Sequence, residues 1–115
     1  MKKIDAIVKT SRFDDIVARL RLIGVAGLTL VEVFRTGPAA TTESMSRGHG
    51  MRMQTVPRYQ LTVVVRDEDV AHVVNAIVHA ARTEAPEASS DGFITVEDVL
   101  GVLRIRTGEE AEAAL

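Results

Sequence analysis

Arg104 and Arg106, in the stretch "LRIRTG" near the end of the chain, have side chains and spacing suited to binding phosphate. A guanidinium presents a fork of N–H donors that matches pairs of phosphate oxygens. Side chains two residues apart on a β-strand project from the same face, so a strand over 102–106 would direct both forks toward one anion. The residues alone leave two interpretations open, a phosphate site or a solvated edge strand.

The three histidines and the carboxylates indicate little catalytic or metal-binding chemistry. His72 and His79 are seven residues apart on a predicted helix, whereas a helical metal pair normally uses a shorter spacing, so we expect a solvated helix face. His49, in "RGHG", could bind a transition metal only loosely. Asp14 and Asp15 fall in the first turn of a helix, where interaction with the helix dipole explains them. The sequence therefore predicts a binding protein, with no catalytic residues and no metal ligands.

Composition limits the class of protein. A chain of 115 residues is expected to form one domain, 1–115. Aromatic residues make up only 3% of the chain, so the core must be built from Val, Ile, Leu and Ala. A net charge of −2 argues against a nucleic-acid binder, and there is no cysteine. No signal peptide or long apolar run is present, so we expect a cytoplasmic protein without membrane insertion.

Hydrophobic periodicity predicts alternating strands and helices. The clearest strand lies at 59–66, where apolar and polar residues alternate. Ser11 is a candidate N-cap for the first helix, and Gly24 is a candidate stop signal after it. A further short strand is expected at 102–106. The full set is strands at 3–9, 27–34, 59–66 and 93–96, with helices at 13–23 and 70–82.

This order predicts an α+β fold, the ferredoxin-like βαββαβ sandwich. A long loop at about 36–57 would separate the second and third strands, a second loop would span about 83–92, and a C-terminal tail would span about 102–115. Loops beyond roughly 12–15 residues are usually functional or disordered, so the first loop is a candidate functional segment. Two helices on one face leave the other sheet face bare, and packing against copies of the chain would cover it.

Segments throughout the chain resemble the PII signal-transduction proteins, which are trimeric ferredoxin-like regulators that read adenine nucleotides. The resemblance is carried by "MKKIDAI", "DDI", "GLTLVEV", "NAIVHAART" and "RIRTGEEAEAAL". It implies a homotrimer with nucleotide in the clefts between subunits. It also implies that the long loop, the T-loop of that family, docks on a protein partner such as a transporter or a metabolic enzyme.

The same resemblance implies a set of nucleotide-binding residues. The "GLT" segment would cradle adenine opposite Val64, although spacing alone favours a strand start and core for these positions. Gly37 would let the backbone approach the phosphates, and "DG" remains from the second-loop motif. Arg104 and Arg106 would bind phosphates across the subunit cleft. The expected residues are Gly27, Leu28, Thr29, Gly37, Val64, Asp91, Gly92, Arg104 and Arg106.

The second loop departs from the family pattern. Glycines that precede Asp91 in the family are absent, Glu84 and Glu87 appear, and Phe93 stands where a lysine is expected. Fewer cations and more carboxylates should weaken binding most for the ligand with most phosphate charge. We therefore expect ADP or AMP to be favoured over ATP.

The long loop also departs from the family pattern. Met51 and His49 replace the modifiable tyrosine and serine, so uridylylation and phosphorylation are not expected. Ala39 replaces the glutamine that helps to hold Mg²⁺ and 2-oxoglutarate, which argues against both ligands. Arg58 keeps a cation where the family has a lysine, and with Gly37 it could bind a small planar anion. Bicarbonate is a candidate because divergent PII-like proteins respond to inorganic carbon.

The predicted function is an adenine-nucleotide-binding regulator whose long loop controls a partner, with bicarbonate metabolism as the candidate pathway. The alternatives are a nitrogen-regulatory PII protein sensing ATP and ADP, or a trimeric binding protein of the metal-tolerance type. A small enzyme using the subunit cleft and a scaffold that has lost its ligand also remain open.

Overall fold

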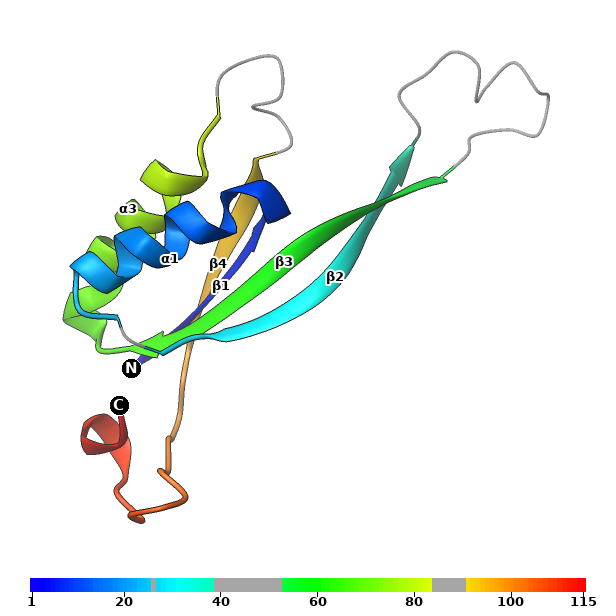
Figure 1. The fold of residues 1–115 in the computed structure, drawn as a ribbon. Coiled ribbons are helices and arrows are strands. Elements are labelled where there is room, and N and C mark those ends of the chain that lie inside the picture. Colours follow the sequence, from blue (N-terminus) through cyan, green and yellow to red (C-terminus); the bar gives the residue numbers. More distant parts are fainter. Residues whose placement is uncertain (26, 39–52, 84–90) are drawn as a thin grey trace, which may run out of the picture.

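The computed structural model describes residues 1–25, 27–38, 53–83 and 91–115 as a sheet with two helices on one side (Figure 1). Every neighbouring pair of strands is antiparallel, and the order across the sheet is β2-β3-β1-β4. The predicted α+β, ferredoxin-like βαββαβ fold is confirmed. The elements are β1 (Lys2–Val8), α1 (Phe13–Leu22), β2 (Thr29–Pro38), β3 (Met53–Val65), α3 (Val70–Ala81) and β4 (Gly92–Asp98).

The hydrophobic core lies between the two helices and the central strands. Alternate residues of β1 and β3 point into it, as the period-2 pattern of the third strand predicted. A fully buried aliphatic side chain contributes about 1.5–3 kcal/mol relative to an exposed one. The strands contribute Ile4, Ala6, Val8, Leu61, Val63 and Val65, and the helices contribute Ile16, Leu20, Val73, Ala76, Ile77, Ala80 and Ala81.

The ends of α1 are fixed by backbone and arginine contacts. The expected Ser11 cap is wrong, because Thr10–Arg12 form a short 3-10 helix and α1 begins after it. The Arg12 guanidinium instead donates to the Ala80 carbonyl, at 3.0 and 2.8 Å, and ties the start of α1 to the end of α3. Gly24 follows the helix with a φ of 90°, as a stop signal should. No helix in the described ranges has the length and hydropathy needed to cross a bilayer.

The second and third strands extend further than the sequence predicted. Pairing continues past Phe34 through four more positions, from Arg35 opposite Val56 to Pro38 opposite Met53. The expected loop at 36–57 is therefore wrong at both ends, and residues 39–52 lie outside the described residues. β2 and β3 together form a two-stranded ribbon, and Arg35, Thr36 and Thr55 in its outer part are exposed. Burial therefore imposed no alternation that the sequence could reveal.

The C-terminal tail does not form the strand expected at 102–106. A single bridge joins Leu103 to Glu110, and the chain between them turns back on itself. The Arg104 amide donates to the Glu109 carbonyl, and the Gly108 amide donates to the Arg104 carbonyl, both at 2.8 Å. Gly108 has a φ of 74°, which a side chain would disfavour, so the local glycine explains the turn.

Replacing Gly92 with alanine should destabilise the fold. Gly92 begins β4 with a φ of +117°, and a Cβ there would lie 1.8 Å from the Ile7 carbonyl oxygen. Because that oxygen belongs to the central strand, we expect a loss of about 2 kcal/mol or more in the free energy of unfolding. Urea denaturation followed by circular dichroism, at one protein concentration, measures it.

The matched control is Gly101→Ala, because a Cβ at Gly101 meets nothing within 4 Å. This control should change the free energy of unfolding by no more than about 0.5 kcal/mol. Equal effects of the two substitutions would contradict the close approach of β4 to β1.

Candidate functional site

A cleft lies between the end of β3, the start of α3 and the C-terminal tail. Its volume is about 770 Å³, and it is lined by three predicted nucleotide-binding residues, Gly27, Val64 and Arg104. Apolar side chains make much of its wall, Arg66 and Arg104 add positive charge, and Asp69 adds a negative charge. Such a lining suits a ligand with an apolar ring at one end and an anionic group at the other.

The remaining residues of the "GLT" segment flank this cleft. Thr29 opens β2 and pairs with Thr62, two residues before Val64 on the same face of β3. Leu28 packs partly against the hydrophobic core, so its side chain has a structural role. The segment that was predicted to hold adenine therefore adjoins Val64, as expected.

The two arginines of the tail do not share a strand face. Arg104 lines the cleft, whereas Arg106 lies in the turn that follows, so the proposed period-2 pair is wrong in this chain. Both side chains are exposed, and neither takes part in an ion pair within the described residues. Their guanidinium groups remain available to an anion.

The other predicted residues lie toward the opposite end of the sheet. Gly37 pairs with Gln54 in the outer part of the ribbon, and Arg58 pairs with Val33. Within the part of the chain that the structure describes, the Arg58 guanidinium donates to its neighbour's carbonyl, Pro57, at 2.8 Å. With a rise of about 3.3 Å per residue, Arg58 and Val64 stand roughly 20 Å apart along β3. A single chain therefore divides the predicted residues into two groups.

The Asp91 carboxylate has hydrogen-bond and ion-pair partners within the chain. It accepts a hydrogen bond from the Thr83 amide at 2.9 Å and another from the Thr83 hydroxyl, and it lies 3.4 Å from the Lys9 ammonium. The hydrogen bonds from Thr83, followed by the charge of Lys9, hold the pKa of this carboxyl below its ordinary value. The contact joins the two described ends of the second loop.

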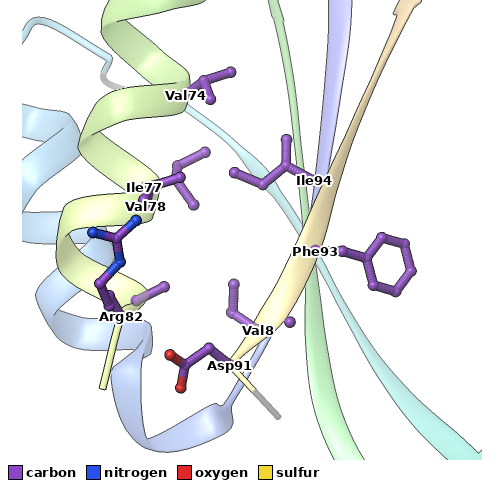
Figure 2. A pocket seen from close by; sticks show the side chains of 10 residues that line it. Val8, Val74, Ile77, Val78, Arg82, Asp91, Phe93 and Ile94 are labelled. Atoms are coloured by element: carbon purple, nitrogen blue, oxygen red, sulfur yellow. The ribbon is translucent and has the colours of Figure 1, made fainter. Parts of the chain in front are cut away.

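A second cleft, which the sequence did not indicate, separates α3 from β4. It has a volume of about 290 Å³ and an apolar lining that includes Val74, Ile77 and Ile94. Figure 2 shows Asp91 on the helix side of β4 and the Phe93 ring on the other side. Arg82 and Asp91 are the charged residues in its described lining, and the other side chains favour apolar contact.

Sequence reading also missed a polar cluster on the uncovered sheet face. Asp5 accepts hydrogen bonds from Thr62 and, at 3.4 Å, from Gln60, and the Lys3 ammonium lies 3.5 Å away. Burial raises the pKa of the Asp5 carboxyl, but the two hydrogen bonds and Lys3 outweigh it and leave the pKa below its ordinary value. The alternation of β1 and β3 places these groups together, and that pattern was the available signal.

A third missed contact joins the two edge strands. The Arg35 guanidinium carbon lies 4.7 Å from the centroid of the Phe93 ring. Sequence reading had treated Phe93 only as the loss of a cation.

Among the described residues, no group of three or more His, Asp or Glu side chains could hold a metal ion. His49, Met51, Ala39, Glu84 and Glu87, which entered the sequence predictions, lie outside the described residues.

Comparison with known proteins gives a consistent result. The family model "Nitrogen regulatory protein P-II" matches residues 1–109. The chain is 38% identical over 115 residues, all of both chains, to "Nitrogen regulatory protein P-II" of Klebsiella oxytoca and to "Nitrogen regulatory protein P-II 1" of Escherichia coli strain K12. A crystal structure of Arabidopsis thaliana PII bound to citrate is similar with a TM-score of 0.77 and 30% identity, covering 99% of this chain and 91% of that one.

Removing the Asp91 charge should destabilise the protein in a pH-dependent way. The folded state depresses the pKa of this carboxyl below its ordinary value of about 3.9, so its stabilisation is complete above that pH and is lost as the pH falls through the depressed value. We expect Asp91→Asn to lower the Tm at pH 7, with the difference from wild type shrinking below about pH 4. Thermal unfolding from pH 7 to pH 3 measures both.

Glu32→Gln is the matched control, because Glu32 is exposed and forms no ion pair within the described residues. It should leave the Tm nearly unchanged at pH 7. If the Asp91→Asn difference were constant with pH, the carboxylate charge would not be its source.

Proposed function

The chain belongs to the nitrogen regulatory protein P-II family, and we propose that it is a homotrimeric regulator that binds an adenine nucleotide between its subunits. Membership makes it a regulatory protein rather than an enzyme. The observation that carries the nucleotide proposal is the cleft that contains Gly27, Val64 and Arg104, where an apolar wall meets an unpaired guanidinium.

The exposed tail supports a site shared between copies. Leu100 and Ile105 have relative exposures of 102% and 97%, and Leu103 is also exposed. Figure 1 shows the tail running away from the sheet and helices. Removing such apolar surface from water contributes about 25 cal/mol per Å², which favours packing on another subunit. A neighbouring tail would then bring its arginines toward the distant group at Gly37 and Arg58.

The choice of nucleotide follows from charge. The second loop contains the acidic residues Glu84 and Glu87 in its sequence, and Asp91 at its end is also acidic. Repulsion from these acids grows with the negative charge of the ligand, so we propose that ADP or AMP is preferred over ATP. Ala39, in place of the family glutamine, gives no support for a firmly held Mg²⁺.

The partner-binding element is proposed to be the β2–β3 ribbon together with the segment it carries. The ribbon extends beyond the end of β1 and away from the helices (Figure 1). We propose that nucleotide binding at its base changes its affinity for a protein partner, either a transporter or a metabolic enzyme. Arg58 would hold a small anion such as bicarbonate beside the nucleotide.

A nitrogen-regulatory role is the second candidate, favoured by the 38% identity to proteins named for it. The two candidates share the nucleotide site and differ in the second ligand. The plant PII structure with citrate holds a carboxylate ligand, which either role accommodates. Titrations with bicarbonate and with 2-oxoglutarate therefore separate them.

Calorimetric titration with ADP tests the nucleotide site. We expect about one ADP per subunit, and we expect Arg104→Gln and Arg106→Gln each to weaken binding about tenfold, because each removes a charge-assisted contact. The matched control Arg21→Gln, on the exposed surface of α1, should bind as wild type does. The absence of ADP, AMP and ATP binding by the wild type would contradict the proposed function.

The second ligand is tested by repeating the ADP titration with each small anion present. Tighter ADP binding with bicarbonate supports an inorganic-carbon regulator, and tighter binding with 2-oxoglutarate supports the nitrogen-regulatory role. Arg58→Gln should abolish the bicarbonate effect while leaving binding of ADP alone unchanged. A bicarbonate effect that survives Arg58→Gln would show that Arg58 does not bind the anion.

A further inference from the structure

Arg35 and Phe93 meet on the sheet face that no helix covers. Arg35 lies on β2 and Phe93 on β4, which are the two edge strands of the sheet. Their registers, Arg35 opposite Val56 and Phe93 opposite Ile7, place both side chains on the face away from the core. Figure 2 shows the Phe93 ring pointing away from α3. The guanidinium carbon lies 4.7 Å from the ring centroid, within the range of a cation–π contact.

The contact links two functional segments of the chain. Arg35 is three positions before Pro38, the last described residue of β2, and Phe93 is the third described residue of the segment that begins at Asp91. Gly37 lies two residues beyond Arg35 on the same strand. The contact therefore places a cation where the outer part of the β2–β3 ribbon faces the start of β4.

This cation has no acidic partner in the described part of the chain. No ion pair there involves Arg35 or Arg58. Asp91, the carboxylate nearest to Phe93 in sequence, lies on the helix side of β4 (Figure 2) and is bound to Thr83 and Lys9. The ion pairs of residues 1–25, 27–38, 53–83 and 91–115 therefore leave the positive charge of Arg35 and Arg58 without a carboxylate partner.

Contact with the Phe93 ring need not occupy the N–H donors of Arg35. A guanidinium uses its face to contact an aromatic ring, while its N–H groups point outward in its own plane. Those groups can form two parallel hydrogen bonds to phosphate oxygens. The ring also restricts the long side chain, which lowers the entropy lost when an anion binds.

We propose that Arg35, held on the ring of Phe93, binds the nucleotide's phosphates at the end of the sheet that carries Gly37 and Arg58, toward which a neighbouring subunit's tail would bring its arginines. Phe93 is a positioning residue that places the guanidinium and carries no ligand contact of its own. The inference rests on the proposed function, because it requires that a nucleotide binds in this region. It predicts that the ligand's phosphates, and not its base, depend on the pair.

Calorimetric titration of the full chain with ADP and with adenosine tests the proposal. We expect Arg35→Gln to weaken ADP binding about tenfold and to leave adenosine binding within about twofold. Phe93→Ala should weaken ADP binding by a smaller factor of about three, because the guanidinium remains but is no longer held. Phe93→Tyr keeps an aromatic face and should bind ADP as the wild type does. The control is Arg19→Gln on the exposed surface of α1.

A charge-relocation variant separates chemistry from folding. The double variant Arg35→Gln/Phe93→Lys removes the guanidinium and supplies a cation from position 93 instead. Part of the ADP affinity lost in Arg35→Gln should therefore be recovered. Circular dichroism and light scattering establish that each variant keeps its fold and assembly.

The outcomes distinguish this proposal from the proposed function. If the wild type bound no nucleotide, the proposed function would fail and this inference with it. If the wild type bound ADP and Arg35→Gln bound it equally well, only this inference would be overturned. Equal losses for ADP and adenosine would also overturn it, since they would indicate a structural role for the stack.

Discussion

Side chains on β1 and β3 alternate between a face covered by α1 and α3 and a face that this chain leaves bare. The covered face holds Ile4, Leu61 and Val63, and the burial of these residues fixes the register of both strands. Slipping either strand by one residue would exchange the two faces, which would expose the core. The same register therefore determines which side chains, among them Val64 and Arg58, are presented to ligands or to other copies of the chain.

Residues under strong burial constraint were predictable from the sequence, and exposed ones were not. The buried strand at 59–66 and the amphipathic helix over Val70–Ala81 could be recognised because core packing imposes their periods. The outer ribbon, with Arg35 opposite Val56, has no buried face and so no period to detect. The tail was misread because apolar residues alternated with arginines there, whereas Gly108 and backbone hydrogen bonds form a turn.

Candidate site residues show a similar limit. The sequence identified Gly27, Val64 and Arg104, and the fold brings these three into one cleft. It did not reveal that the Asp91 carboxylate is bound to Thr83, because hydrogen bonds across the ends of a loop leave no pattern in composition or spacing. A position that matches a binding motif can thus also hold two segments of the chain together.

Phe93 illustrates why charge must be counted in space and not along the sequence. Read by position, a phenylalanine in place of a lysine removes a cation from the second loop. In the folded chain the ring lies under the Arg35 guanidinium, which comes from the opposite edge strand and has no acidic partner among the described residues. An aromatic ring can hold a cation there at little desolvation cost, because the guanidinium edge stays in water. The electrostatics of this end of the sheet therefore depend on β2 and β4 together, and any ligand bound between them would sense the position of both.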